Sequence, residues 1–408
     1  MKKIAIITLA VALTNEKGYS RFRSLAEILS EKYEVDIITS SFQHWEKKQR
    51  NIEQLLKDNS NQKYKIKFAY EPGYRKNIDL KRIRSHRIAV KNILNILSQE
   101  QYDLIYCIIP DNHMAACIAR YAKNKNIKLI IDVEDLWPEA MQMVVHMPKL
   151  LDKAIFDGFR KDARTAYEFA DGIIGTSDEY RDFPFNKYGI DVAYRETVYV
   201  GVDLADFDHG VKEYSSIIKK NDEEFWITYA GNLGSSYDIS TLIKAAQLIY
   251  EKKYMDIKIK ILGGGPLEKE FKDVMNEKKC NVDFIGYTPY QKMAAYLYKS
   301  DVTINSFVKK APQSIVTKIG DYLAAGKPMI NTCSSSEFRR KVENDGFGIN
   351  IIAEDVEALY DVIIGLYENR KKCNTMGVIA RKIAEKQFDR KNSYQVIVKM
   401  VNDILSEE

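Results

Sequence analysis

The sequence predicts an α/β protein of two doubly wound domains, each a parallel sheet covered by helices. Short, continuous apolar runs alternate with amphipathic segments along the whole chain, as in β-α-β units joined by right-handed crossovers. The length of 408 residues exceeds what one hydrophobic core usually supports, which favours two domains of about 200 residues. Both observations point to a pair of Rossmann-like domains with a cleft between them.

The first half of the chain carries six apolar runs that we expect to form parallel strands. The runs are short and show little polar alternation, which is typical of strands buried on both faces. These strands are predicted at Ile4–Ala10, Val35–Thr39, Ile66–Ala69, Asp103–Ile109, Lys128–Val133 and Gly172–Thr176. Helices are predicted at Ser20–Lys32, Ile78–Leu97, Met114–Ala122 and Leu151–Phe169.

The second half repeats this rhythm. Strands are predicted at Trp226–Ala230, Ile257–Leu262, Val282–Ile285, Val302–Asn305, Met329–Thr332 and Gly348–Ile352. Helices are predicted near 239–252, 266–278, 289–299, 314–325, 335–344, 355–370, 374–386 and 391–405. We expect an N-terminal domain over 1–205, a C-terminal domain over 206–390, and a last helix over 391–408 that crosses back to the first domain.

Composition narrows the class of protein. Apolar residues make up 45% and charged residues 29%, which is ordinary for a globular protein, and a net charge of +5 is mild. Five scattered cysteines without a CxxC pair favour reduced thiols in a cytoplasm, and argue against a disulfide framework or a zinc site. No run of 18 apolar residues exists, so we expect no membrane span.

One stretch, Ala311–Ile330, has the features of a phosphate-binding helix start. Its sequence is APQSIVTKIGDYLAAGKPMI, and Ser314 is a plausible N-cap for a helix of about three turns. Lys318 and Asp321 share a face of that helix. A lysine near a helix N-terminus suits a phosphate, and a carboxylate one turn later suits sugar hydroxyls. The alternative is an ordinary surface ion pair.

Ligands of doubly wound domains bind at the carboxyl ends of the strands, which places the site in the loops that follow them. These loops are Ala12–Tyr19, Pro110–His113 and Glu134–Glu139 in the first domain, and Gly231–Asp238, Gly263–Pro266, Gly286–Pro289 and Lys309–Ser314 in the second. Glycines there allow close backbone approach to a phosphate. The absence of GxxxxGK[ST] and of GxGxxG disfavours a P-loop nucleotidase and a standard dinucleotide enzyme.

Several motifs, in order, carry a family resemblance. The series YAGNLG, IKILGGGP, VDFIGYTP and TKIGDYLAAGKPMI resembles the donor-binding half of glycosyltransferase family 4, a retaining family with the GT-B fold. DVEDLWPE at Asp132–Glu139 resembles a segment of bacterial capsular and exopolysaccharide-assembly members. VGVDLADF at Val200–Phe207 resembles the family's domain linker. The resemblance covers both predicted domains.

The resemblance implies a donor site for a nucleotide sugar, linked to UDP or GDP. Its residues would be Gly231, Asn232, Tyr237, Gly264, Gly265, Gly286, Tyr287, Gln313, Ser314 and Asp321. The family usually has arginine and lysine at the positions of Asn232 and Tyr237, and a glutamate at Gln313. These departures leave Lys318 as the principal positive charge on the donor diphosphate.

The chemistry that the resemblance implies asks for positioning and charge stabilisation. The leaving diphosphate can take the acceptor's proton on the same face, while Lys318 stabilises the negative charge. No acidic cluster suited to a metal is present, and no cofactor is expected beyond the nucleotide-sugar substrate. Glu134 and Asp135 follow a strand and are candidates for contacting the acceptor hydroxyl. The alternative for Asp135 is a cap on the turn that ends at Trp137.

The acceptor side is expected in the first domain, near Gly18, Tyr19 and His113. A polyprenyl-diphosphate-linked or oligosaccharide acceptor would fit a basic helix: Arg75, Lys76, Lys81, Arg82, Arg84, Arg87 and Lys91 lie within 17 residues. Such a stripe suits the anionic inner face of a bacterial membrane, although a charge run is usually a solvated face. No nucleic-acid module accompanies it. We expect a cytoplasmic protein with peripheral membrane contact.

Three functions remain open from the sequence. The first is a retaining sugar transferase of bacterial surface-polysaccharide biosynthesis. The second is a GT-B-type sugar-nucleotide 2-epimerase, which five histidines without a cluster disfavour. The third is a non-catalytic sugar-nucleotide-binding scaffold, which the substitutions at Asn232, Tyr237 and Gln313 favour.

Overall fold

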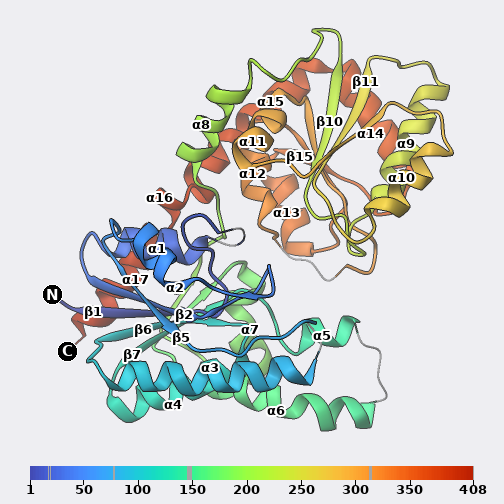
Figure 1. Cartoon of the computed structure of the whole chain (residues 1–408). Coiled ribbons are helices and arrows are strands. Elements are labelled where there is room, and N and C mark those ends of the chain that lie inside the picture. The colour runs from blue at the N-terminus through green and yellow to red at the C-terminus, as the bar shows by residue number, and fades with distance from the viewer. Residues whose placement is uncertain (17, 19, 77–78, 145–148, 312–314, 408) are drawn as a thin grey trace. The chain divides into compact units, whose positions relative to one another are not determined.

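The computed structural model divides the chain into two compact units (Figure 1). Unit 1 comprises Met1–Val198 with Tyr394–Glu408, and unit 2 comprises Tyr199–Ser393. The structure describes residues 1–407 except 17, 19, 77–78, 145–148 and 312–314, and it leaves the side chains of 142–154 undescribed. Each unit is described below by itself.

Unit 1 is built on a seven-stranded parallel sheet in the order β5-β2-β1-β6-β7-β8-β9. Its strands are β1 (Lys3–Ile7), β2 (Glu34–Ser40), β5 (Lys65–Ala69), β6 (Leu104–Ile109), β7 (Lys128–Val133), β8 (Gly172–Gly175) and β9 (Tyr194–Thr197). A small antiparallel hairpin, β3 (Phe42–Gln43) with β4 (Lys48–Gln49), follows β2. All six residues of β6 are buried, as expected for a strand covered on both faces.

Helices cover both faces of the unit 1 sheet, with α3, α4 and α6 on one face and α1 and α17 on the other (Figure 1). The helices are α1 (Arg21–Leu29), α2 (Ile52–Asp58), α3 (Leu80–Ser98), α4 (Asn112–Lys125), α5 (Glu139–Val144), α6 (Lys149–Glu168), α7 (Asp178–Tyr188) and α17 (Gln395–Ser406). One contiguous apolar cluster contains the strands, α1, α4 and α17. The prediction of a doubly wound domain is confirmed for this unit.

A buried charge cluster links three parts of unit 1. The Arg21 side chain at the start of α1 is fully buried, and its Nε donates to Asp132 Oδ2 in β7 at 3.0 Å. The guanidinium also donates to the Val198 carbonyl oxygen and to the Tyr394 hydroxyl. Tyr106 in β6 donates to the same Asp132 carboxylate at 2.7 Å. These bonds satisfy polar groups whose isolated burial would be destabilising.

Unit 2 contains a six-stranded parallel sheet in the order β12-β11-β10-β13-β14-β15. Its strands are β10 (Phe225–Ala230), β11 (Ile257–Leu262), β12 (Val282–Gly286), β13 (Val302–Asn305), β14 (Met329–Asn331) and β15 (Gly348–Asn350). Its helices are α8 (Leu204–Tyr214), α9 (Ile239–Glu251), α10 (Glu268–Asn276), α11 (Tyr290–Lys299), α12 (Lys318–Ala324), α13 (Ser336–Asp345), α14 (Val356–Glu368), α15 (Arg370–Ile383) and α16 (Arg390–Ser393), with a π-helical turn η1 (Ala384–Phe388). The doubly wound prediction is confirmed here too.

The strand order decides where each unit presents a binding edge. In unit 2 the chain starts at β10, moves outward through β11 and β12, and then returns to the other side of β10 with β13. In unit 1 the same reversal separates β1 from β6. At such a switch point the loops after two neighbouring strands diverge and leave a crevice at the carboxyl edge of the sheet.

Several predicted elements differ in extent from the observed ones. The first strand ends at Ile7, because the apolar residues that follow are buried in a loop without strand pairing. The helix expected over 314–325 begins only at Lys318 and has seven residues. The β-branched run Ile315–Thr317 before it disfavours a helix, and the residue preceding the helix, Thr317, makes no side-chain cap. Ser314 lies outside the described residues.

The chain leaves unit 1 after Val198 and returns to it at Tyr394. The predicted domain boundaries lie after residues 205 and 390. Residues 204–214 form α8, a helix that is not among the predicted ones. The helix expected at 374–386 starts earlier, at Arg370, where Asn369 caps it. The last helix, α17, packs on β8 and β9 of unit 1.

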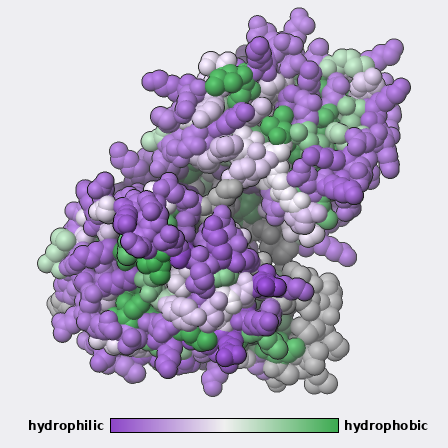
Figure 2. Space-filling view, viewed as in Figure 1, coloured by the Kyte–Doolittle hydropathy of each residue, from purple (hydrophilic) through white to green (hydrophobic). Residues whose placement is uncertain are grey.

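Among the described residues, no helix is both long and apolar enough to cross a bilayer. The face seen in Figure 2 is mainly hydrophilic, with hydrophobic side chains gathered in small, separate patches.

Candidate functional site

Three glycine-bearing loops meet at the carboxyl edge of the unit 2 sheet. The loop after β10 contains Gly231, the loop after β11 contains Gly263 to Gly265, and the loop after β12 starts at Gly286. The Gly231 amide donates to the Leu262 carbonyl oxygen, and the Gly263 amide donates to that of Gly286 at 2.8 Å. Backbone hydrogen bonds therefore tie the three loops into one edge.

The glycines are required by this close approach. A Cβ on Gly263 would lie 1.8 Å from the Gly231 carbonyl oxygen. A Cβ on Gly265 would lie 2.4 Å from Asn232 Oδ1 and 2.5 Å from the Leu233 carbonyl oxygen. No side chain fits in either place, so glycine is needed for the loops to pack this closely against each other.

Lys318, the first residue of α12, lies at the switch point beside these loops. Its Cδ is 3.7 Å from the position that a Cβ on Gly231 would occupy. Tyr322, one turn later in α12, bonds both the amide and the carbonyl of Ala230 at the end of β10, at 2.9 and 3.0 Å. This pair of bonds fixes α12, and with it Lys318, against the end of the central strand.

The Lys318 ammonium sits inside a cluster of aromatic rings. Its Nζ lies 4.2 Å from the centroid of the Tyr237 ring, 4.5 Å from that of Tyr229 and 5.0 Å from that of Phe307. Tyr322 completes the cluster at 6.0 Å. The ring faces attract a cation, but they supply no counter-charge.

Among the described residues, Lys318 Nζ is buried and has no hydrogen-bond partner. Burial lowers the pKa of Lys318 to about 7, because the charged form loses its hydration. An oxyanion that entered this cluster would supply both the missing hydrogen bonds and the missing negative charge. The arrangement is therefore suited to binding a phosphate group.

Asp321 lies one turn after Lys318 but faces a different neighbour. Its Oδ1 accepts a hydrogen bond from the Tyr290 hydroxyl at 2.9 Å, at the start of α11 and just after the Gly286–Pro289 loop. Burial raises the pKa of Asp321 to about 6, although the Tyr290 bond acts in the opposite direction. Its role in binding ribose remains a prediction. The carboxylate already accepts one hydrogen bond, from Tyr290.

The other predicted donor residues occupy varied positions. Asn232 is exposed, and its carbonyl oxygen accepts from the Tyr229 hydroxyl at 2.7 Å. Gly286 has a left-handed φ of 81°, and Tyr287 beside it is 68% exposed. Gly264 faces the Glu268 carboxylate. Gln313 and Ser314 lie outside the described residues.

The predicted acceptor-side acids are both engaged within unit 1. Glu134 Oε1 lies 3.1 Å from Arg21 Nε. Asp135 accepts from the Leu136 amide at 2.9 Å and from Trp137 Nε1 at 3.0 Å. It therefore caps the turn that ends at Trp137, which is the alternative given for it in the sequence analysis. Burial raises the pKa of Asp135. A contact of either acid with an acceptor stays a prediction.

His113 is helical and not part of a loop, because α4 starts at Asn112. Its Nδ1 pairs with Asp162 of α6 at 3.2 Å, and that bond raises the pKa of His113 to about 10. Gly18 is exposed with a φ of 129°, and a Cβ there would overlap the Trp45 ring at 2.4 Å. Tyr19 lies outside the described residues.

A dense polar cluster that was not predicted lies at the carboxyl edge of the unit 1 sheet. His86 of α3 lies between two acids: its Nδ1 pairs with Asp111, and its Nε2 is 3.7 Å from Glu71 Oε1. His44 shares a hydrogen bond with Tyr74 in the same cluster. Glu71 and Asp111 each stand two residues after a strand end, and this spacing is the signal that points to them.

Arg82 lies along the same cluster. Its guanidinium packs over the rings of Tyr74 and Trp137, at 5.3 and 5.0 Å from their centroids. In unit 2 the positions of Tyr229, Phe307 and Tyr322 around Lys318 were also not predicted. Strand and helix patterns indicate only that such aromatic side chains belong to the hydrophobic core. In the part of the chain that the structure describes, no three His, Cys, Asp or Glu side chains are grouped as a metal site.

The chain is similar to known proteins in part of its sequence and in its fold. Residues 211–383, less than half of the chain, match the family model described as glycosyl transferases group 1. No curated protein sequence matches the chain. The matched segment contains every glycine loop described above, together with Lys318 and Asp321.

Solved structures match the chain over nearly its whole length. Anabaena HepE in complex with UDP has a TM-score of 0.70 at 14% identity, covering 99% of this chain and 100% of that one; its complex with UDP-glucose has a TM-score of 0.67 at 15% identity. Sucrose-phosphate synthase from Thermosynechococcus elongatus has a TM-score of 0.74 at 15% identity, covering 100% of both chains.

WaaG, a glycosyltransferase involved in lipopolysaccharide biosynthesis, has a TM-score of 0.68 at 11% identity, covering 99% of this chain and 100% of that one. At such identities the likeness concerns the fold. Residues 211–383 therefore match a glycosyl transferases group 1 domain, within a chain of two Rossmann-like units that has the GT-B fold.

Proposed function

We propose that the protein is a retaining, metal-independent glycosyltransferase of bacterial surface-polysaccharide assembly. It would move a hexosyl group from a nucleotide sugar, linked to UDP or GDP, to a lipid-linked or oligosaccharide acceptor. Unit 2 would bind the donor, and unit 1 would supply the groups that contact the acceptor. The family match of residues 211–383 and the nucleotide-bound Anabaena relative support the donor class.

The observation that carries the proposal is the buried Lys318 ammonium without a hydrogen-bond partner among the described residues. It stands at the switch point of the unit 2 sheet, where ligands of this architecture bind. A cation that is left unsatisfied in an apolar site is unfavourable unless a ligand completes it. The departing nucleotide diphosphate is the group that this reaction would bring to it.

In the proposed reaction the bond from the anomeric carbon to the diphosphate oxygen breaks. The acceptor oxygen forms its bond on the same face of the sugar and gives its proton to the leaving diphosphate. Lys318 would stabilise the negative charge that grows on that diphosphate, in a site where water does not screen it. The glycine-loop backbone would hold the nucleotide in place for the transfer.

The first test removes the ammonium. Lys318→Ala should lower kcat by at least about a hundredfold, because a preorganised charge on the leaving group is worth about that much. Lys244→Ala, at an exposed position of α9, is the matched control and should keep the activity. An unchanged kcat in Lys318→Ala would exclude this lysine from the mechanism.

The second test separates the proposed transferase from other activities on the same fold. The protein is incubated with UDP-, GDP- and dTDP-sugars, with and without a polyprenyl-linked acceptor. Transfer that requires the acceptor supports the proposal, epimer formation without acceptor indicates a 2-epimerase, and binding without turnover indicates a scaffold. A thermal-shift screen with the same nucleotides identifies the donor, since a ligand of the native state raises Tm.

We also propose that unit 1 contacts the cytoplasmic face of the membrane, where a polyprenyl-linked acceptor would lie. Arg75, Lys76, Lys81, Arg84, Arg87 and Lys91 are all exposed. Leu80, at 82% exposure, and Ile83, at 39%, stand among them at the start of α3. Exposed apolar side chains beside several cations suit the interface of an anionic bilayer.

Vesicle binding tests this contact. The wild type should sediment with vesicles that contain anionic phosphatidylglycerol, and a variant with Arg84→Gln, Arg87→Gln and Lys91→Gln should not, because each cation near such a surface contributes about 1 kcal/mol. Lys123→Gln, Lys125→Gln and Lys161→Gln, on α4 and α6, provide a control of equal charge change. Equal sedimentation of the two triple variants would contradict a role for the α3 cations.

A further inference from the structure

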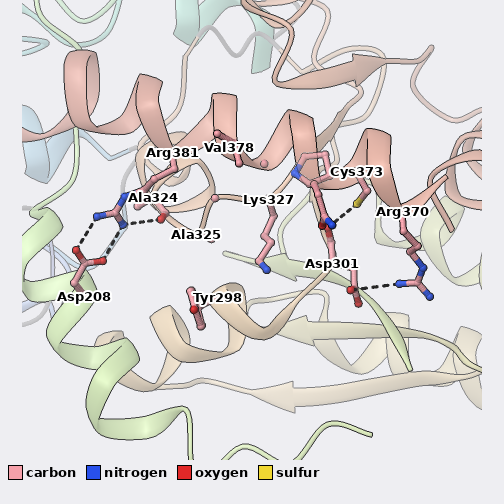
Figure 3. A pocket seen from close by; sticks show the side chains of 14 residues that line it. Asp208, Tyr298, Asp301, Ala324, Ala325, Lys327, Arg370, Cys373, Val378 and Arg381 are labelled. Carbon is pink, nitrogen blue, oxygen red and sulfur yellow. Dashed lines mark hydrogen bonds and ion pairs between the residues drawn. The ribbon is translucent and has the colours of Figure 1, made fainter. Parts of the chain in front are cut away.

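Unit 2 contains a cavity at the opposite edge of its sheet from the Lys318 site. It lies where β13 and β14 begin, between α8, α11, the end of α12 and α15 (Figure 3). Its volume of about 500 Å³ is within the range of small-molecule sites. All residues that line it belong to unit 2, and none of them belongs to the donor loops.

Two glycines give the cavity its wall. Gly326 ends α12 with a left-handed φ of 64°, and Gly377 of α15 lies directly against it. A Cβ on Gly377 would lie 2.3 Å from the Gly326 carbonyl oxygen. This contact anchors α15 on the turn before β14, and the cavity opens beside it.

Most charged groups in the wall are already paired. Arg381 forms a bidentate pair with Asp208, with N–O distances of 2.8 and 2.7 Å, and donates to the Ala324 carbonyl oxygen at 3.0 Å (Figure 3). Asp301 accepts from Lys220 at 2.5 Å and from the Trp226 amide at 2.6 Å. These groups have little capacity left for a ligand.

Lys327 and Arg370 differ from them. Lys327 has no hydrogen-bond or ion-pair partner among the described residues, and it extends toward the space between Tyr298 and Asp301 (Figure 3). Its Nζ is 5.4 Å from the centroid of the Tyr298 ring. Arg370 makes one long polar contact, 3.5 Å, to Asp301 Oδ1, and its guanidinium packs over the rings of Phe225 and Tyr367. Both cations therefore keep N–H donors for a ligand.

The local charge balance specifies the kind of ligand. Burial lowers the pKa of Lys327, Asp301 acts to raise it and Lys220 to lower it further, so these three groups interact electrostatically. Lys220 and Arg370 form ion pairs with the Asp301 carboxylate, whereas Lys327 interacts with it only electrostatically and without a direct contact. Three cations with one anion leave an excess of about two positive charges, which a dianion would neutralise.

We propose that this cavity is a binding site for a small phosphate monoester, with the phosphate on Lys327 and Arg370 and the organic part against the half-exposed Tyr298 ring. Arginine presents a planar fork of donors and lysine a point charge, and together they match phosphate oxygens. The site is independent of the proposed transferase reaction. It would serve as an effector site.

Titration calorimetry on the full-length protein tests the proposal, with glucose 6-phosphate as the probe and glucose as the uncharged control. Glucose 6-phosphate should bind with a Kd of about 1 mM or lower, and glucose should not bind. Lys327→Met should weaken the binding at least tenfold. Arg370→Gln should do the same, and it keeps the test valid if Lys327→Met does not fold. Lys371→Met, an exposed neighbour in α15, should bind as the wild type does.

Lys318→Met distinguishes this cavity from the proposed donor site. If the probe binds the cavity, Lys318→Met leaves its Kd unchanged even where transferase activity is lost. Loss of binding in Lys318→Met with retention in Lys327→Met would overturn the proposal, because the phosphate would then occupy the donor site. Absence of binding to the wild type would overturn it as well.

Discussion

At the scale of single residues, the chemistry of unit 2 depends on where one ammonium is placed. A lysine on a helix surface keeps its hydration and its charge, whereas Lys318 is enclosed by the rings of Tyr229, Tyr237 and Phe307. The rings offset only part of the lost hydration, so the pKa of Lys318 falls to about 7. The lysine at the proposed donor site is thus poised between its two charge states near neutral pH.

This poise predicts a pH-dependent donor affinity. In the proposed mechanism the protonated lysine binds the diphosphate, and in the ligand-free protein the protonated population falls about tenfold per pH unit above pH 7. The Kd for UDP-glucose should therefore rise about tenfold per pH unit between about pH 7 and 9, as measured by titration calorimetry. Lys318→Met should bind more weakly and lose this slope. A wild-type Kd that stays constant over this range would contradict the assignment.

At the scale of elements, the glycine loops and α12 form the binding edge as one unit. The loops are fixed to each other by backbone contacts too close for side chains, and Tyr322 fixes α12 to the end of β10. Glycines in these loops carry no side chain that would keep a ligand away from the backbone. Rigid loops also reduce the ordering that donor binding requires.

A pair of glycine substitutions tests this role. Gly265→Ala should weaken UDP-glucose binding at least tenfold, because its Cβ would displace the loop at Asn232 and Leu233. Gly365→Ala, in the exposed middle of α14 with no atom within 4 Å of the new Cβ, should leave binding unchanged and stabilise the protein by up to about 1 kcal/mol. Calorimetry and urea unfolding measure the two effects. Equal binding by both variants would contradict the importance of the loop contact.

At the scale of the whole molecule, unit 1 is assembled from both ends of the chain. α17 lies about 200 residues from the rest of unit 1 in sequence, yet it fills that unit's core. Its buried side chains are Ile397, Met400, Val401, Ile404 and Leu405. Burial of five such side chains contributes on the order of 10 kcal/mol, which is comparable to the stability of an entire domain.

Deletion of residues 394–408 should therefore unfold unit 1 selectively. Scanning calorimetry should show that the unfolding transition of unit 1 is lost or moves to a much lower temperature. The transition whose Tm increases when UDP-glucose is added should persist. Deletion of Glu407 and Glu408 alone should have little effect, because α17 ends at Ser406 and keeps all its buried side chains. A truncated chain that keeps every transition of the wild type would contradict the role of α17 in unit 1.

The periodicity of the sequence determined the fold class and most elements. Strands such as β6 and β10 are continuous apolar runs, and this pattern follows from burial on both faces, which is a local property. The same pattern placed the glycine loops and Lys318 at strand ends. The pattern overextended the first strand, because the apolar loop residues after Ile7 are buried in the same way as strand residues. It also placed the start of α12 too early, because the β-branched run before Lys318 continues the apolar spacing without forming a helix.

The tertiary structure alone decided what each polar side chain faces. Sequence spacing put Lys318 and Asp321 on one helix face, but the fold encloses the first in aromatic rings and bonds the second to Tyr290. Glu71 and Asp111 follow the ends of two strands, β5 and β6, and both lie beside His86 of α3, the helix that connects those strands. Likewise Lys327 and Arg370 line one cavity, because Gly326 and Gly377 allow the turn after α12 to pack directly against α15. Long-range packing sets the burial and charge of these groups, and no local pattern encodes it.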